Sequence, residues 1–278
     1  MFLAGLSIAL CTHGDVGVST FVLDFDILPG ETAVDFVTVV NSSEVPQAVT
    51  IEPVDWVPVS PGTQHYLPPG SLDRSLASWL RFWPSEASIE PGDSVDVQVE
   101  LRAPTSAEGC YWGMLFVKLA GVSGSGEPDE SSSSVGMQVI LGVAVYANCG
   151  SGDIQGRIAS FATAPADPAR QLLLILEFED TGITRLDPTG YIDIIDTDGL
   201  TVRQLRLSEF VSLPGTCQKI EIPLTRLPSN DVRQEGTPFE GDPPLPAGNY
   251  LAIAIIDYGG DALVGAQCPF EIQDKEIE

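Results

Sequence analysis

The sequence predicts an all-β protein made of two tandem immunoglobulin-like β-sandwich domains. Three observations support this fold class. Short segments alternate apolar and polar residues, Gly- and Pro-rich turns separate them at even spacing, and the second half repeats the order of the first. Such alternation is typical of strands with one buried face, and helical periodicity is rare along the chain. The 278 residues suffice for two domains of about 100–150 residues each.

We expect a signal peptide over residues 1–14, an N-terminal domain over 15–149 and a C-terminal domain over 150–278. The initial run MFLAGLSIAL has the length of a signal-peptide core but lacks the usual basic start. Cys11 raises the possibility of lipidation, yet Leu10 stands where a small residue normally precedes a lipidated cysteine. No later segment reaches about 18 consecutive apolar residues, so we expect no membrane insertion of the mature chain. A periplasmic, cell-surface or secreted location follows.

The first half reads as a series of strands. STFVLDFDI precedes the turn LPGE, the strand TAVDFVTVVN and a third strand in QAVTIEPVDW, and 57–70 reads as a loop. Segment 71–80 breaks the β pattern, so we expect one or two helical turns there with Ser71 as the cap. The residues at helical spacing are Leu72, Leu76, Trp79 and Leu80. LRFWP, SEASIEPGD and SVDVQVELRAP then lead to a hairpin.

This hairpin organises the first half. Its strands are GCYWGMLFVKL and VGMQVILGVAVYANC, and the acidic loop AGVSGSGEPDESSSS joins them. In the second strand one face carries Met137, Val139, Leu141, Val143 and Val145, which fits a sandwich interior. On the other face only Ile140 and Tyr146 are large, so that face suits packing by the neighbouring domain or a visiting strand. The candidate partner-binding residues are Met137, Val139, Ile140, Leu141 and Val143. Permanent cover by the acidic loop and the second domain is the alternative.

The second half follows the same plan. Its strands lie in ARQLLLILEFED, GYIDIIDTDGLTVRQLRL, LPGTCQKIEIPL and LPAGNYLAIAIIDYGGDALVGAQCPFEI. A Pro-Gly turn, an alternating strand, a loop and a Gly-x-Tyr motif occur in both halves, at 91–111 and at 214–250. Two copies of one sandwich design explain this repetition.

The cysteines point to an oxidising compartment. Removal of the signal peptide with Cys11 leaves four cysteines, an even number that predicts two disulfides. We expect Cys110–Cys149 to close the open end of the hairpin, because their midpoint lies in the acidic loop. By exclusion we expect Cys217–Cys268.

The charge excludes several partners. Lys and Arg number 13 against 39 Asp and Glu, a formal net charge of −26, which repels nucleic acid and anionic lipid. Solubility or a salty environment explains this acidity, with divalent-cation binding as the alternative. Asp193, Asp196 and Asp198 before Gly199 resemble a calcium loop, but an EF-hand would need acids in place of Ile194 and Leu205. We therefore interpret this segment as a hairpin turn.

Enzymatic chemistry finds little support, and we expect no cofactor. The two histidines are His13, within the expected signal peptide, and His65, in a Pro-rich loop, so a histidine-based metal centre or catalytic triad is disfavoured. The cysteines are too far apart for paired zinc ligands, and no phosphate loop occurs. Four tryptophans could form a sugar platform, but sandwich cores also use tryptophan, and the neighbours of Trp79 and Trp112 favour the core. The other two are Trp56 and Trp83.

The segments ILPGETAVDFVTVVNSS and FWPSEASIEPGDSVDVQVELRAP resemble the first domain of periplasmic pilus chaperones, the PapD-like superfamily. In that family the last strand of this domain completes the unfinished sandwich of a pilus subunit. The second half matches in general architecture, and a similar plan occurs in surface proteins that interact with WxL domains. The family anchors the subunit carboxylate with an Arg and a Lys on two strands. VSTFVLDFD and VGMQVILGVAVYANC contain no basic residue, so the resemblance implies the fold and strand exchange without that anchor.

These observations predict an exported, non-catalytic protein-binding protein of the pilus-chaperone type. We expect it to engage a pilus or surface subunit through a β-strand edge or the interdomain cleft. The alternative is a cell-surface structural or carbohydrate-binding module, and a weaker one is a secreted hydrolase that uses acidic residues.

Overall fold

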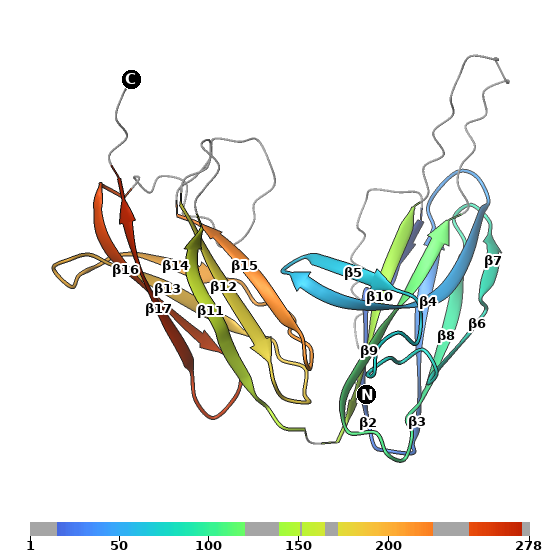
Figure 1. Ribbon diagram of the computed structural model, residues 1–278. Helices are drawn as coiled ribbons and strands as arrows, with labels where there is room; N and C mark the ends of the chain where they lie inside the picture. Colours follow the sequence, from blue (N-terminus) through green and yellow to red (C-terminus); the bar gives the residue numbers. More distant parts are fainter. Residues whose placement is uncertain (1–15, 120–138, 151, 165–171, 225–244, 274–278) are drawn as a thin grey trace, which may run out of the picture. The chain divides into compact units, whose positions relative to one another are not determined.

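The computed structural model describes residues 16–119, 139–150, 152–164, 172–224 and 245–273 (Figure 1). Strands and turns account for these residues, which contain no helix, and hence none that could cross a membrane. The predicted all-β class is confirmed. The chain divides into two compact units, one comprising Met1–Trp56 with Tyr66–Ser151, the other Val57–His65 with Gly152–Glu278.

The first sandwich has one sheet of four strands and one of six. The four-stranded sheet has the order β1 (Val16–Val18), β3 (Thr32–Asn41), β8 (Ser94–Arg102), β6 (Leu80–Trp83). The six-stranded sheet has the order β2 (Val22–Ile27), β10 (Ile140–Cys149), β9 (Gly109–Leu119), β4 (Gln47–Ser60), β5 (Thr63–Leu67), and β7 (Glu86–Ile89) also pairs with β4. The pairing of β2 with β10 is parallel, and the neighbouring pair of β10 with β9 is antiparallel.

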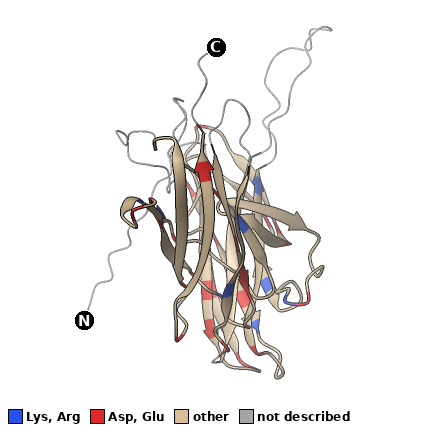
Figure 2. Ribbon diagram, turned by 60° about the vertical axis from the view of Figure 1, so that its left-hand side comes forward, with Lys and Arg blue, Asp and Glu red and all other residues tan. Residues whose placement is uncertain are grey.

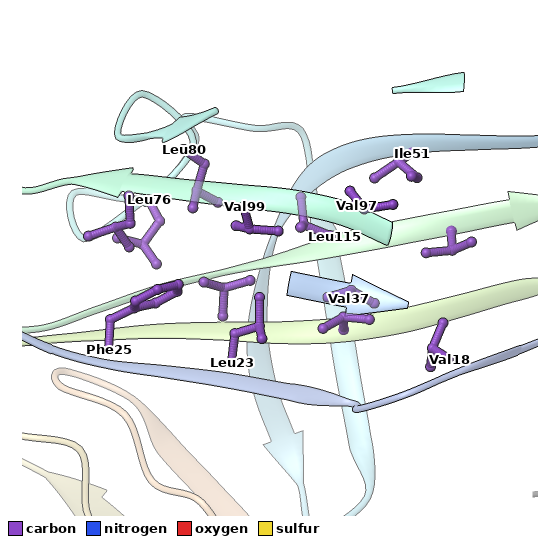
Figure 3. Packing of buried hydrophobic residues seen from close by; sticks show 14 of the residues in the cluster. Val18, Leu23, Phe25, Val37, Ile51, Leu76, Leu80, Val97, Val99 and Leu115 are labelled. Atoms are coloured by element: carbon purple, nitrogen blue, oxygen red, sulfur yellow. The ribbon is translucent and has the colours of Figure 1, made fainter. Parts of the chain in front are cut away.

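The core of this sandwich follows from the alternation read in the sequence. In β8 the side chains of Val97, Val99 and Leu101 are buried, while their neighbours along the strand face outward. The opposite sheet contributes Leu23 and Phe25 of β2 and further residues of β9 and β10 to the same cluster. Figure 3 shows these side chains gathered between the strands.

The second unit also has two sheets. One has the order β11 (Gly156–Ala164), β12 (Leu173–Asp180), β15 (Cys217–Pro223). The other has the order β14 (Thr201–Leu207), β13 (Thr189–Ile195), β16 (Gly248–Asp257), β17 (Val264–Ile272). Phe178 lies fully buried in its core, with its ring edge-on to that of Phe210.

The prediction of one or two helical turns at 71–80 is wrong. The segment forms successive turns, and Ser71 donates its hydroxyl proton to the Pro68 carbonyl instead of capping a helix. The backbone of this segment pairs with β9, because the Trp112 N–H donates to the Arg74 carbonyl and the Leu76 N–H donates to the Trp112 carbonyl. The apolar spacing in this segment therefore arises from turn residues that point inward, such as Leu76, which is fully buried in the core.

The predicted register of Cys110 with Cys149 is wrong by one residue. Cys149 lies opposite Gly109, and Cys110 lies opposite Asn148. Because neighbouring residues of a strand point to opposite faces, the two cysteine side chains leave the sheet on opposite sides. Cys149 belongs to the sandwich core and Cys110 to the outer face. A disulfide closing the hairpin does not fit this pairing.

The predicted Cys217–Cys268 disulfide also has no support in the geometry, since the structure contains no bond between these two cysteines. Cys217 lies opposite Glu179, which lies opposite Arg157 in β11. Burial raises the pKa of Cys268, and a backbone hydrogen bond with Thr163 lowers it, which places this thiol beside Thr163. Arg157 and Thr163 are six residues apart in β11, about 20 Å at about 3.3 Å per residue. A disulfide requires Cα atoms within about 7 Å.

Candidate docking edge

The candidate partner-binding residues lie at the start of β10. Val143 is fully buried in the core, and Val139 and Leu141 pack against that core from the same face. This matches the inner face expected from the alternation. Ile140 is on the outer face and 43% exposed. Met137 lies outside the described residues.

The N-terminal segment switches from one sheet to the other and so pairs with only half of β10. β1 pairs with β3, and after a turn at Thr20 the chain becomes β2, which pairs with β10 from Ala144 onward. The Thr20 hydroxyl stabilises this turn, since it donates to the Val22 carbonyl at 2.8 Å and accepts from the Val22 N–H at 3.1 Å. Among the strands that the structure describes, none pairs with Ile140–Val143 on the side away from β9.

The hydrogen bonds at both ends of this segment show which backbone groups face the free side. The Leu119 N–H donates to the Val139 carbonyl, so odd-numbered residues of β10 bond to β9. The Ala144 N–H donates to the Phe21 carbonyl, so even-numbered residues point to the β2 side. Ile140 and Gly142 therefore direct their N–H and C=O groups out of the open edge. We call this stretch, Ile140–Val143, the β10 edge.

Exposed apolar side chains surround the β10 edge. Phe21 is 47% exposed and Val22 is 48% exposed, and both lie where β2 meets β10. With Ile140 they give the edge an apolar border. A Cβ atom added to Gly142 would lie 2.7 Å from Met114 Sδ, so the side chain of Met114 fills the space over this glycine. The edge thus combines free main-chain groups with apolar contact area, which is what strand addition requires.

Charged groups near the β10 edge are already paired. Lys118 lies opposite Ile140 and forms an ion pair with Glu52 on β4. At the far end of β10, the Asn148 amide donates to the Asp24 and Asp26 carboxylates. Figure 2 shows Lys and Arg at isolated positions along the described strands.

The outer face of β10 is more covered than the sequence suggested. Tyr146 is buried and packs edge-on against Trp56 of β4. The Trp56 indole N–H donates to the Gly113 carbonyl at 3.1 Å, and the Trp112 indole N–H donates to the Trp56 carbonyl at 2.7 Å. These side chains form a second apolar layer on the face opposite the core. No residue pattern indicates that β4 pairs with β9, so sequence reasoning missed this layer.

The remaining candidate residues lie apart from one another. Trp56 is buried and Trp83 is 77% exposed in a different sheet, so these two tryptophans form no common sugar platform. His65 is exposed in β5. The Asp196 carboxylate accepts hydrogen bonds from the N–H groups of Asp198 and Leu200, which is the role of a turn residue. No cluster of metal ligands occurs among the described residues.

No family model and no curated protein sequence matches the chain. Among solved structures it is similar to a chaperone–tip adhesin complex of CFA/I fimbriae, with 8% identity over 92% of this chain and 99% of that chain and a TM-score of 0.48. It is also similar to the class 5 fimbriae chaperone CfaA, with 10% identity over 91% and 98% of the chains and a TM-score of 0.45. The third is the Escherichia coli chaperone DraB, with 13% identity over 92% and 98% and a TM-score of 0.41.

Proposed function

We propose that this chain is an exported, non-catalytic protein-binding protein of the pilus-chaperone type, located in the periplasm or at the cell surface. Its partner, a pilus or surface subunit, adds a β-strand along the β10 edge. The observation that carries the proposal is the outward direction of the N–H and C=O groups of Ile140 and Gly142, on a stretch that pairs with no described strand on that side. Strand addition draws its affinity from such main-chain groups.

The side chains of the β10 edge support the same proposal. Val139, Leu141 and Val143 hold the strand against the core, so the edge keeps its shape before a partner arrives. Preorganisation lowers the entropy cost of binding. Ile140, Phe21 and Val22 add exposed apolar area beside the free backbone groups.

The experiment replaces Ile140 with proline. Proline removes the N–H of Ile140, which points to the free side, and leaves the hydrogen bonds of Val139 and Leu141 to β9 in place. Ile140 is the first residue of β10, a position that tolerates proline. The loss of one hydrogen bond and the unpaired partner carbonyl cost about 1–3 kcal/mol, about 5- to 150-fold in affinity.

Binding is measured by fluorescence anisotropy with a labelled peptide of alternating valine and threonine. Wild type should bind, and Ile140→Pro should bind more weakly by the factor above while its circular dichroism stays unchanged. The control is Val34→Pro on the other sheet, where the N–H also faces an open edge. Equal binding by Ile140→Pro and wild type, or the absence of binding by wild type, would contradict strand addition.

A carbohydrate-binding module is the second candidate, and one observation favours it. Trp83 on β6 and Phe36 on β3 both lie opposite Gln98 of β8, so the three side chains share the outer face of the four-stranded sheet. Both rings are largely exposed, at 77% and 52%. They are separated by two strand spacings, about 10 Å. The two aromatic rings can stack on sugar rings, and the Gln98 amide between them can form hydrogen bonds with sugar hydroxyl groups.

A further inference from the structure

The sheet switch of the N-terminal segment leaves a second open edge, on β3. The Asn41 N–H donates to the Asp93 carbonyl, so odd-numbered residues of β3 bond to β8. The Ser19 N–H donates to the Thr38 carbonyl, so even-numbered residues face the β1 side. β1 ends at Val18, so the part of β3 that precedes Thr38 pairs with no described strand on the β1 side. The main-chain groups of residues 34 and 36 therefore point outward, and we call this stretch the β3 edge.

Asp35 occupies the middle of the β3 edge. It lies opposite Val99, on the face that Val37 and Val39 turn to the core, yet its carboxylate is exposed. Its Oδ1 accepts a hydrogen bond from the Phe36 N–H at 2.8 Å. One outward donor of the edge is thus bound by the neighbouring side chain. An inward-facing charge on an edge strand is a common device against unwanted strand pairing.

A second copy of this chain fits the β3 edge. Two copies related by a twofold axis would pair antiparallel, and the register that uses both residues 34 and 36 places Val34 opposite Phe36 of the second copy. Both side chains are exposed on the outer face, so they would form apolar cross-strand contacts. In this register Asp35 lies directly opposite Asp35 of the second copy, and like charges at that position are destabilising.

We propose that Asp35 prevents the β3 edge from pairing with the β3 edge of a second copy of this chain. The carboxylate acts in two ways, because it binds the Phe36 N–H and because it repels the same carboxylate across the twofold axis. At the β10 edge, by contrast, no side-chain oxygen of the described residues accepts from the N–H of Ile140 or Gly142. The protein therefore keeps one of its two open edges available and guards the other.

The test compares Asp35→Val with wild type by sedimentation equilibrium on the full chain. Wild type should stay monomeric, and Asp35→Val should dimerise with an association constant at least tenfold higher. The matched control is Glu100→Val, which removes the same charge from β8, opposite Val34, without touching the edge backbone. It should stay monomeric. Adding Val34→Pro to Asp35→Val should restore the monomer, because proline removes an outward N–H group.

Two results would overturn the proposal. One is a folded Asp35→Val that remains as monomeric as wild type, and the other is a Glu100→Val that dimerises to the same extent. Asp35→Asn keeps an oxygen for the Phe36 N–H and removes the charge, so it should dimerise more than wild type and less than Asp35→Val. If Asp35→Val does not fold, a monomeric Asp35→Asn counts against the proposal.

Discussion

Replacement of Asp55 by alanine should strongly destabilise the first unit. The Asp55 carboxylate is 1% exposed and accepts two hydrogen bonds, from the Leu72 N–H at 3.0 Å and from the Ser75 hydroxyl at 2.7 Å. These bonds hold the turns of 71–80 in place beside β9. A hydrogen bond to a charged group contributes about 1.5–3 kcal/mol, and its loss leaves a part-buried donor unpaired. The two bonds together predict a loss of about 3–6 kcal/mol, which is a large part of the stability of about 5–15 kcal/mol that is typical of a domain.

The assay is urea unfolding followed by tryptophan fluorescence. All four tryptophans belong to the first unit, so their emission reports on that unit alone. The control is Asp96→Ala, which removes one exposed hydrogen bond to the Thr38 hydroxyl and should cost less than about 1 kcal/mol. If Asp55→Ala changes the free energy of unfolding by no more than the control does, the carboxylate does not hold the turns and this reasoning is refuted.

Two further predictions concern Cys217 and Trp83. The pKa of Cys217 is raised by burial and by the charges of Glu177 and Glu179, and lowered by Arg157. The thiolate is the nucleophile in labelling by iodoacetamide. The midpoint pH of labelling without reductant should therefore fall in Glu179→Gln and rise in Arg157→Gln. A failure of Cys217 to label would indicate a disulfide instead. If the outer face of the four-stranded sheet binds glycans, added oligosaccharide should quench fluorescence in wild type and lose its effect in Trp83→Ala, and an unchanged response in that variant would argue against a site there.

Alternation along single strands made the sandwich predictable. The inner face of β10 and the buried positions of β8 follow directly from the period of two, because each strand has one face toward the core. The open edge was predictable only in outline. The pairing of β2 with β10 begins at Ala144 because the chain turns at Thr20. No residue pattern in the sequence shows that β2 pairs with β10 from this point.

Features set by contacts between distant segments were not predictable. The leucines of 71–80 have helical spacing, but the carboxylate of Asp55 and the backbone of β9 take up the hydrogen bonds that a helix would have used. The cysteine register failed for a related reason. A long loop does not fix the register of a hairpin as a two-residue turn does, and a slip of one residue moves every side chain to the other face.

One cause explains both open edges. The N-terminal segment leaves β3 after Val18 and joins β10 only at Ala144, so in the described part of the chain it pairs with part of each strand and exposes two backbone edges. Their sequences differ in one respect: TAVDFVTVV carries an acid at the centre of its open stretch, whereas VILGVAV carries none. A free edge is a liability unless it is used. The asymmetry between a guarded β3 and an unguarded β10 therefore favours β10 as the edge that a partner occupies, and it predicts that blocking β10 affects partner binding while unblocking β3 affects self-association.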